Sequence, residues 1–153
     1  MAADLYARLK GAVMDKLLGL GLDGVGQNVV SQWQPDALNT EYPLCAVLHP
    51  PDDFEEIGDG TTEENDLTVP FLVLFLERGG KREAFKEPRV QGWREQALFA
   101  FTPDRIDAFA AAVPEAWNLE LVPRQIVDPR ARAFDLVASS FVLRVTVRKP
   151  KVY

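Results

Sequence analysis

Apolar residues recur every three or four positions at the start of the chain, which is the spacing of an amphipathic helix. The residues that hold this spacing are Leu5, Leu9, Val13, Leu17 and Leu20. Asp4 lies just before them and is a good N-cap. Glycines at positions 19, 21, 24 and 26 then break the pattern. The chain therefore opens with a predicted helix that ends in a glycine-rich turn.

The pattern then changes to short apolar runs that indicate strands. Residues 28–33 favour a short strand, and residues 42–49 form an apolar run that stops at Pro50. Residues 67–77 are apolar at alternating positions of both kinds, so both faces of this strand are apolar. The strand is therefore expected to be central in the sheet or covered. Pro43 cannot donate to a ladder, which places the start of the second run near a sheet edge.

Between those runs, residues 52–66 combine many carboxylates with no basic residue. The acids are Asp52, Asp53, Glu55, Glu56, Asp59, Glu63, Glu64 and Asp66. Gly58 and Gly60 add conformational freedom. This composition predicts a long, exposed and flexible acidic loop.

The second half predicts two helical segments and then two strands. Residues 89–101 place Val90, Trp93 and Phe101 on one helical stripe, and residues 105–113 form a shorter segment. Residues 117–127 and 133–147 follow as strands, and the last one alternates apolar residues with a polar side that carries Arg144 and Arg148. Trp93 and Trp117 are both expected in the core.

The predicted fold class is therefore α+β. The elements suit a mixed, largely antiparallel sheet of about four or five strands with two or three helices beside it. A chain of 153 residues that is 47% hydrophobic suits one domain spanning residues 1–153. No apolar run is long enough for a membrane span, and the first residues do not follow a secretory signal pattern. Cys45 is the sole cysteine, which fits a reducing compartment.

The net charge of −6 hides an uneven distribution along the chain. Residues 1–77 carry 3 basic and 14 acidic side chains, and residues 78–153 carry 14 basic and 9 acidic ones. If folding leaves this polarity on opposite surfaces, complementary fields would steer copies of the chain together head to tail. The competing interpretation is that folding mixes the acidic and basic side chains over solvated surfaces.

The residues that carry enzyme chemistry are scarce. Residues 19–24 match G-x-G-x-x-G by letter, but a helix precedes them, whereas dinucleotide binding requires a strand to enter and a helix to leave. Cys45 and His49 are four residues apart on a predicted strand, about 13 Å by strand geometry, so they form no local dyad. We therefore expect a helix-ending turn, a core thiol and a strand-end histidine, with no catalytic residue and no cofactor.

Metal and nucleic-acid binding find little support. The acidic segment does not follow the EF-hand spacing, so no metal site is assigned to it. A basic C-terminal side, which holds Arg124, Arg130, Arg132, Arg144, Arg148, Lys149 and Lys151, is one feature of nucleic-acid binders. The acidic pI of about 4.8 argues against DNA affinity of its own and favours a protein contact.

The order of predicted elements resembles that of tail terminator proteins, also called tail completion or neck proteins, of tailed bacteriophages. The likeness rests on the opening helix, the hairpin of residues 42–49 and 67–77 around the acidic loop, the Trp93-Arg94 helix and the late strand 139–147. It implies a hexameric ring of structural virion protein that caps the tail tube, ends tube polymerisation and joins the tail to the head connector. Genomic DNA would pass through the lumen without specific binding. Assembly would take place in the host cytoplasm, with no membrane involved.

Within that likeness, the charged residues are the expected interface. They are Asp52, Asp53, Glu55, Glu56, Asp59, Glu63, Glu64, Arg144, Arg148, Lys149 and Lys151. The alternative is a small α+β ligand-binding domain or enzyme that uses His49, Cys45 and Asp52 at the mouth of a pocket.

Overall fold

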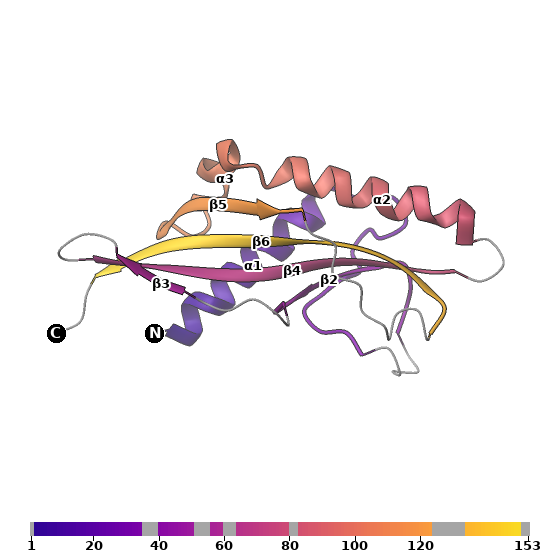
Figure 1. Cartoon of the computed structure of the whole chain (residues 1–153), viewed down its shortest axis with the longest axis horizontal. Helices are drawn as coiled ribbons and strands as arrows, with labels where there is room; N and C mark the ends of the chain where they lie inside the picture. The colour runs from indigo at the N-terminus through magenta and orange to yellow at the C-terminus, as the bar shows by residue number, and fades with distance from the viewer. Residues whose placement is uncertain are drawn as a thin grey trace.

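The computed structural model describes residues 2–34, 40–50, 56–59, 64–79, 83–123 and 134–150. The elements in chain order are α1 (Ala2–Gly19), β1 (Val29–Val30), β2 (Leu44–Leu48), β3 (Glu56–Asp59), β4 (Glu64–Arg78), α2 (Glu83–Ala100), a 3₁₀ turn (Pro103–Arg105), α3 (Ile106–Ala110), β5 (Ala116–Val122) and β6 (Leu136–Pro150). Figure 1 shows helices and sheet along one elongated body. The predicted α+β class is confirmed.

The sheet is built around two strands of 15 residues each, β4 and β6, which pair antiparallel along their whole length. The strand order is β1-β2-β4-β6-β5, and β3 also pairs with β4. β1 runs parallel to β2, and the other described pairs are antiparallel, so the sheet is mixed as predicted. Only Val29 and Val30 of the predicted strand 28–33 join the sheet.

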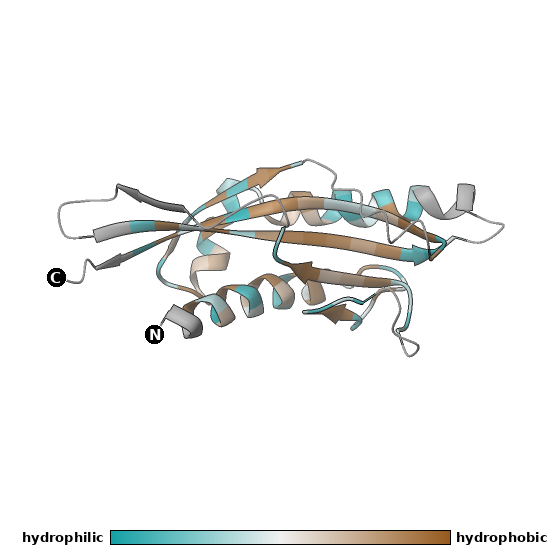
Figure 2. Ribbon diagram, turned by 60° about the horizontal axis from the view of Figure 1, so that its bottom comes forward, coloured by the Kyte–Doolittle hydropathy of each residue, from teal (hydrophilic) through white to brown (hydrophobic). Residues whose placement is uncertain are grey.

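The two faces of β4 explain why its sequence is apolar throughout. Phe71, Val73 and Phe75 belong to a core cluster that includes the buried residues of all three helices. The residues between them, such as Leu72 and Leu74, point to the opposite face and form a second cluster with Trp33 and Leu44. Figure 2 shows this apolar middle of the long strands in brown. We call the first side the helix face of the sheet.

The helices attach to the helix face through the stripes that the sequence predicts. In α1, Leu9 and Val13 are fully buried, and in α2 Trp93 is 2% exposed. Full burial of such side chains contributes on the order of 1.5–3 kcal/mol each. None of the described helices is both long and apolar enough to cross a bilayer.

Several predicted boundaries were wrong. α2 begins at Glu83 and contains Pro88, whereas the sequence placed its start after that proline. Pro88 is exposed in the second turn, and the buried stripe that follows it holds the helix on the sheet despite the lost N–H bond. The third helical segment divides into the 3₁₀ turn and α3, and β5 ends at Val122, before Pro123.

The flexible loop predicted for residues 52–66 was also wrong in part. Residues 56–59 form β3, and residues 64–66 begin β4, so both stretches of the acidic segment are paired strand. β2 and β3 lie one after the other along the same side of β4. Pro70 falls between Leu72, the last β4 residue paired with β2, and Thr68, the first paired with β3. The missing N–H of Pro70 therefore lies where β4 has no described partner on that side.

Candidate functional site

One end of the sheet consists of β3 with its paired neighbours. We call β3, residues 64–68 of β4 and residues 146–150 of β6 the arm. The tip of the arm lies beyond α1 and β5 along the long axis of the molecule (Figure 1). Because only the tip of the arm projects past the helices, a contact with another molecule can form there without displacing them.

The arm brings the acidic and basic segments of the chain together. The register places Asp66 opposite Arg148 and Asn65 opposite Lys149. Arg148 Nε and Nη2 donate to the two carboxylate oxygens of Asp66 at 2.8 and 3.2 Å. These hydrogen bonds, with the charge of Arg148 and a hydrogen bond from Trp117, hold the pKa of Asp66 below its usual value. The pair is therefore a fixed, charge-assisted link between β4 and β6.

Polar side chains cover part of the face of β4, β6 and β5 on which Asp66 and Arg148 lie. This polar face consists of Asp66, Thr68, Asn118, Glu120, Arg144, Thr146 and Arg148, which the strand registers place in successive rows. The Thr68 and Thr146 hydroxyls are 2.9 Å apart and share a hydrogen bond. Arg144 lies opposite Glu120. On this face, the acids lie on β4 and β5, and the bases lie on β6 between them.

Trp117 lies beside the polar face and is not the core residue that the sequence predicted. It is 48% exposed, and the Arg148 guanidinium lies over its ring at 5.0 Å. The register shifts between Ala116 and Asn118, and Trp117 occupies this irregularity. The extra residue of a bulge is turned out of the regular alternation, which explains why Trp117 escapes burial although Ala116 is buried. Trp93, by contrast, is a core residue as predicted.

The predicted interface residues occupy different places. Arg144 and Arg148 lie on the polar face, and Glu56, Asp59, Glu64 and Lys149 are strand residues of the arm. Asp52, Asp53, Glu55, Glu63 and Lys151 lie outside the described residues. The structure therefore gathers five of the predicted interface residues in the arm, and Arg144 lies outside it, opposite Pro70. The sequence did not single out Trp117 as an interface residue.

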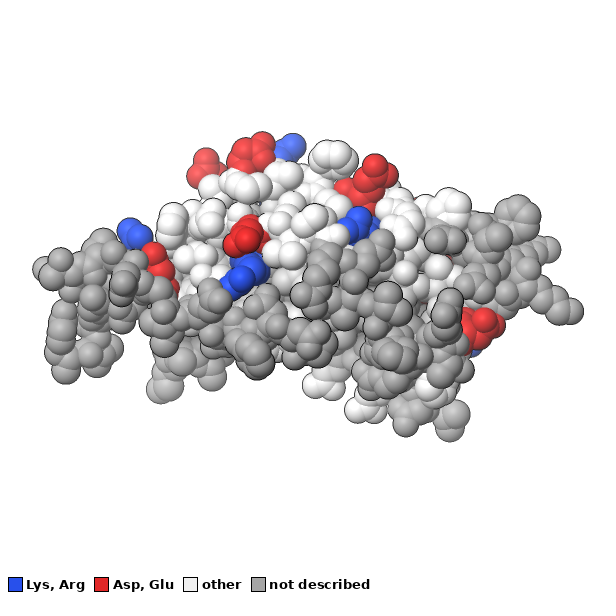
Figure 3. All heavy atoms as spheres, in the orientation of Figure 1, with Lys and Arg blue, Asp and Glu red and all other residues white. Residues whose placement is uncertain are grey.

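Charge in the described residues is paired between the two halves of the chain. Arg8 bonds to Glu115, Arg89 to Asp23 and Glu77, and Arg148 to Asp66, so each pair joins residues 1–77 to residues 78–153. Figure 3 shows acidic and basic side chains side by side on the visible face. Folding thus places these acids of one half of the chain beside bases of the other half. This agrees with the interpretation in which folding mixes the charged side chains over the surface.

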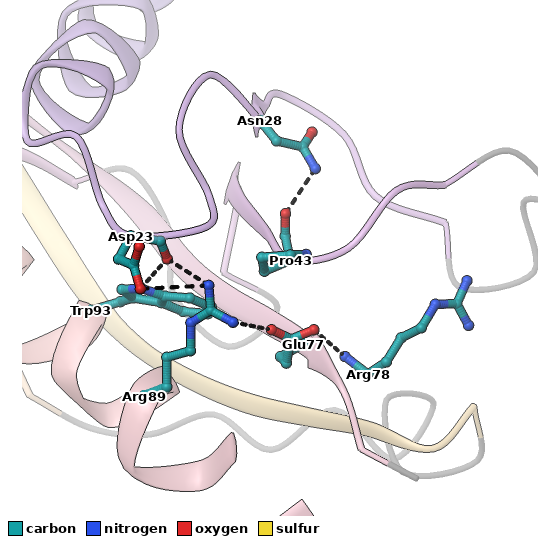
Figure 4. A network of polar contacts seen from close by, with 7 residues as sticks. All are labelled: Asp23, Asn28, Pro43, Glu77, Arg78, Arg89 and Trp93. Atoms are coloured by element: carbon teal, nitrogen blue, oxygen red, sulfur yellow. Dashed lines mark hydrogen bonds and ion pairs between the residues drawn. The ribbon is translucent and has the colours of Figure 1, made fainter. Parts of the chain in front are cut away.

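A second polar network fixes the glycine-rich turn against the sheet (Figure 4). Arg89 of α2 donates to the buried Glu77 carboxylate at 3.1 Å and to the Asp23 carbonyl at 3.1 Å. Trp93 Nε1 donates to the same carbonyl at 2.9 Å. Gly24 has a φ of +82°, and a Cβ there would lie 1.7 Å from Arg89 Nη2. This network ties three elements together, so its role is structural.

The helix-ending turn predicted at residues 19–24 is confirmed. α1 ends at Gly19, and Gly21, with φ +58°, follows it and donates to the Leu18 carbonyl at 3.2 Å. A helix enters this segment from its N-terminal side, so its amide groups are not at a helix start, where a phosphate would bind.

The structure does not bring together the two described residues of the alternative site, Cys45 and His49. Cys45 is fully buried, and burial raises the pKa of its thiol, which opposes thiolate formation. His49 is exposed after the end of β2, with Nδ1 3.0 Å from the Pro50 carbonyl oxygen. Asp52 lies outside the described residues. A hollow of about 410 Å³ is lined by Asn28, Val30, Gln32, Trp33, Gln34, Thr40, Glu41 and Leu44, a set that contains neither Cys45 nor His49. Among the described residues, no group of three His, Cys, Asp or Glu side chains is placed to hold a metal ion.

Comparison with known proteins gives little beyond this geometry. No known protein family and no curated protein matches the sequence. A solved structure described as "Virion of native gene transfer agent (GTA) particle" contains a similar chain, with a TM-score of 0.45 and 14% identity. The similarity covers 92% of this chain and 94% of that chain. A likeness of this degree assigns neither a family nor a function.

Proposed function

We propose that this chain is a structural virion protein of a phage-type tail. Copies form a ring that caps the tail tube, ends tube polymerisation and joins the tail to the head connector. The observation that supports this proposal is the arm, a strand-paired end of the sheet that carries both acidic and basic residues and whose tip projects past the helices of its own subunit.

The arm suits assembly because it offers backbone as well as charge. Among the described strands, β3 pairs with β4 alone, so its other edge can receive a strand from a neighbouring subunit. The Asp66–Arg148 pair holds the two long strands in register behind that edge. A preformed edge loses less conformational entropy on binding than a flexible loop would.

A ring requires a heterologous contact, in which two different surfaces of each subunit meet and the rotation between neighbours closes. The arm at one end of an elongated subunit gives the two ends different chemistry. The hexameric number comes from the resemblance to tail terminators, as do the tube and connector partners. In this role the chain acts by binding, without catalysis or a cofactor, in the virion after assembly in the host cytoplasm.

DNA would pass through the ring without specific contacts. The chain carries a net charge of −6, and its described arginines at the arm and the glycine-rich turn are paired with carboxylates. A protein that neutralises few phosphates has little sequence-independent affinity for DNA. An acidic lumen would let DNA move through during ejection.

The direct test is tube polymerisation with and without this chain. Tail tube protein of the same particle would be polymerised, and tube length measured by electron microscopy. We expect tubes of limited length with this chain at one end. Tubes that grow to the same length and do not bind the chain would contradict the proposal.

Variants with a neutralised arm show whether the arm carries this activity. Glu56→Gln with Asp59→Asn removes two arm carboxylates, and Asp15→Asn with Asp107→Asn removes two exposed carboxylates elsewhere as a matched control. We expect the arm variant to cap fewer tubes and the control to act as the unmodified chain.

A further inference from the structure

β6 is much longer than its neighbour β5, so the two strands pair over only part of β6. The last paired residues are Val122 of β5 and Val142 of β6. From there β6 continues to its first residue, Leu136, along the part of the molecule that α2 spans (Figure 1). Among the described residues, no strand pairs with this stretch on the β5 side. We call residues 136–141, on that side of the strand, the β6 edge.

The backbone of Ser140 points out of the β6 edge. The Arg148 N–H donates to the Glu115 carbonyl, so the backbone groups of Arg148 point toward β5. Along an antiparallel strand this direction alternates from residue to residue, so the backbone groups of Val142 and Ser140 point the same way. The Ser140 carbonyl is therefore the acceptor that the next residue of β5 would use if that strand continued.

Arg94 of α2 binds this acceptor instead. Its Nε donates to the Ser140 carbonyl at 2.7 Å, and its Nη2 donates to the Pro123 carbonyl at 2.5 Å. Pro123 directly follows β5 and has no N–H with which to extend the ladder. The guanidinium therefore bridges β6 and the end of β5 and holds a positive charge where the next strand residue would pair. One turn earlier in α2, Gln91 Oε1 accepts a hydrogen bond from the Ser139 hydroxyl at 3.2 Å, which fixes the helix over the same stretch.

The side chains of the β6 edge offer no protection of their own. Residues 136–141 are Leu, Val, Ala, Ser, Ser and Phe, with neither a charged residue nor a proline. An uncharged strand with an open edge readily pairs with the same edge of a second copy. Folded proteins prevent such pairing by placing a charge at the edge or by covering it. Here the charge comes from α2.

We propose that Arg94 blocks the β6 edge against pairing with a second copy of this chain. A strand of a second copy needs the Ser140 carbonyl as an acceptor, so it would have to displace the guanidinium from both carbonyls. Pairing two identical edges would also bring the Arg94 charges of the two copies near each other, which is unfavourable. The block does not require the proposed ring, but within such a ring it would reserve strand addition for the arm.

The test compares Arg94→Leu with Gly24→Ala. Arg94→Leu removes both hydrogen bonds and the charge but keeps an aliphatic side chain on the sheet. Gly24→Ala disturbs the same helix through Arg89 and leaves Arg94 in place, so it is the control for lost stability. Self-association of each full chain is measured by sedimentation velocity, and stability by melting temperature. We expect Arg94→Leu to associate at least about tenfold more tightly than the unmodified chain, and Gly24→Ala to change association less than about twofold.

Hydrogen exchange then locates the contact between copies. Peptides that cover residues 136–141 are followed by mass spectrometry over a series of protein concentrations. In Arg94→Leu, their protection should rise with concentration, because their N–H groups donate to the second copy. Arg105→Leu makes the same exchange at an exposed residue outside this edge, and its peptides should behave as in the unmodified chain. Arg94→Gln keeps an amide donor without the charge, should associate to an intermediate degree, and replaces Arg94→Leu if that variant does not fold.

The proposal is overturned if folded Arg94→Leu, or Arg94→Gln in its place, associates no more tightly than the unmodified chain. It is equally overturned if Gly24→Ala or Arg105→Leu associates as strongly, because association would then follow lost stability or lost charge. Protection that rises only outside residues 136–141 would also refute it. None of these results decides the proposed function, which tube capping by the unmodified chain tests separately.

Discussion

At the scale of single residues, the link between Asp66 and Arg148 sets how the arm responds to pH. The folded pKa of Asp66 lies below its value in the unfolded chain, first because Arg148 donates hydrogen bonds to it. The pair therefore contributes stability above the unfolded pKa and loses it as the pH falls through the folded pKa. Carboxyl titration by NMR should show Asp66 titrating below the usual range in the unmodified chain.

The matched variant is Arg148→Gln, which keeps a polar side chain but removes the guanidinium and its charge. The pKa of Asp66 should then rise toward its ordinary value. An unchanged titration of Asp66 in that variant would show that another group holds the carboxylate ionised.

Gly24 and Gly26 both have positive φ angles but differ in their surroundings. A Cβ at position 24 displaces the Arg89 guanidinium and leaves the buried Glu77 with only the Arg78 N–H as a partner, whereas a Cβ at position 26 meets nothing within 4 Å. We expect Gly26→Ala to lower the free energy of unfolding by about 1 kcal/mol through backbone strain alone. Gly24→Ala should cost about 2–3 kcal/mol. Urea unfolding of the two variants measures the difference, and equal losses would contradict the role of Arg89.

Lys16 is a source of instability within α1. Its Nζ is buried over the Phe101 ring at 5.3 Å and has no hydrogen-bond partner among the described residues, and burial together with Arg105 lowers its pKa. We expect Lys16→Met to raise the free energy of unfolding by about 1 kcal/mol. Lys10→Met is the control, because Lys10 Nζ donates to the Ser31 carbonyl at 2.9 Å and its loss should not stabilise the chain. A melting temperature that falls in Lys16→Met would contradict this reading.

At the scale of elements, Trp93 is the main anchor of α2. Its side chain is buried, and its Nε1 bonds to the Asp23 carbonyl. Trp93→Ala should lower the free energy of unfolding by about 3–5 kcal/mol, because it leaves a cavity and removes one of the two hydrogen bonds to the Asp23 carbonyl. Trp117→Ala removes the same side chain from an exposed position and should cost less than about 1 kcal/mol. Chemical denaturation of the pair checks this, and similar losses at both positions would refute the assignment of Trp117 to the surface.

The elements show what a sequence pattern can and cannot predict. The buried stripes of α1 and α2 and the alternation of β6 follow local periodicity, so these elements and the α+β class were predictable. β3 was missed because two of its four residues, Glu56–Asp59, are acidic and one is glycine, and they become strand only by pairing with β4. The same pairing converts the predicted acidic loop into the arm.

The candidate site was predictable only in its charges. Arg144 and Arg148 stood out because a polar side alternates with a buried one along β6. Trp117 did not stand out, because its exposure depends on a register shift between β5 and β6 that no local pattern encodes. The placement of the bases of β6 beside the acids of β4 likewise depends on the register between these two strands.

At the scale of the whole molecule, part of the polarity of the sequence is taken up in ion pairs between the two halves of the chain. Basic residues of one half and acids of the other meet at the arm, at the glycine-rich turn and at Glu115. Long-range attraction between oppositely charged ends therefore contributes less to assembly than the sequence suggests. Short-range contacts at the arm become the main candidates for specificity.

The central claim is that copies of this chain assemble head to tail into a closed ring at the end of a tube. Native mass spectrometry of the full chain, alone and with tail tubes of the same particle, tests this most directly. The account predicts one discrete ring-sized species, formed in solution or released from tube ends. Single copies alone under both conditions would contradict it.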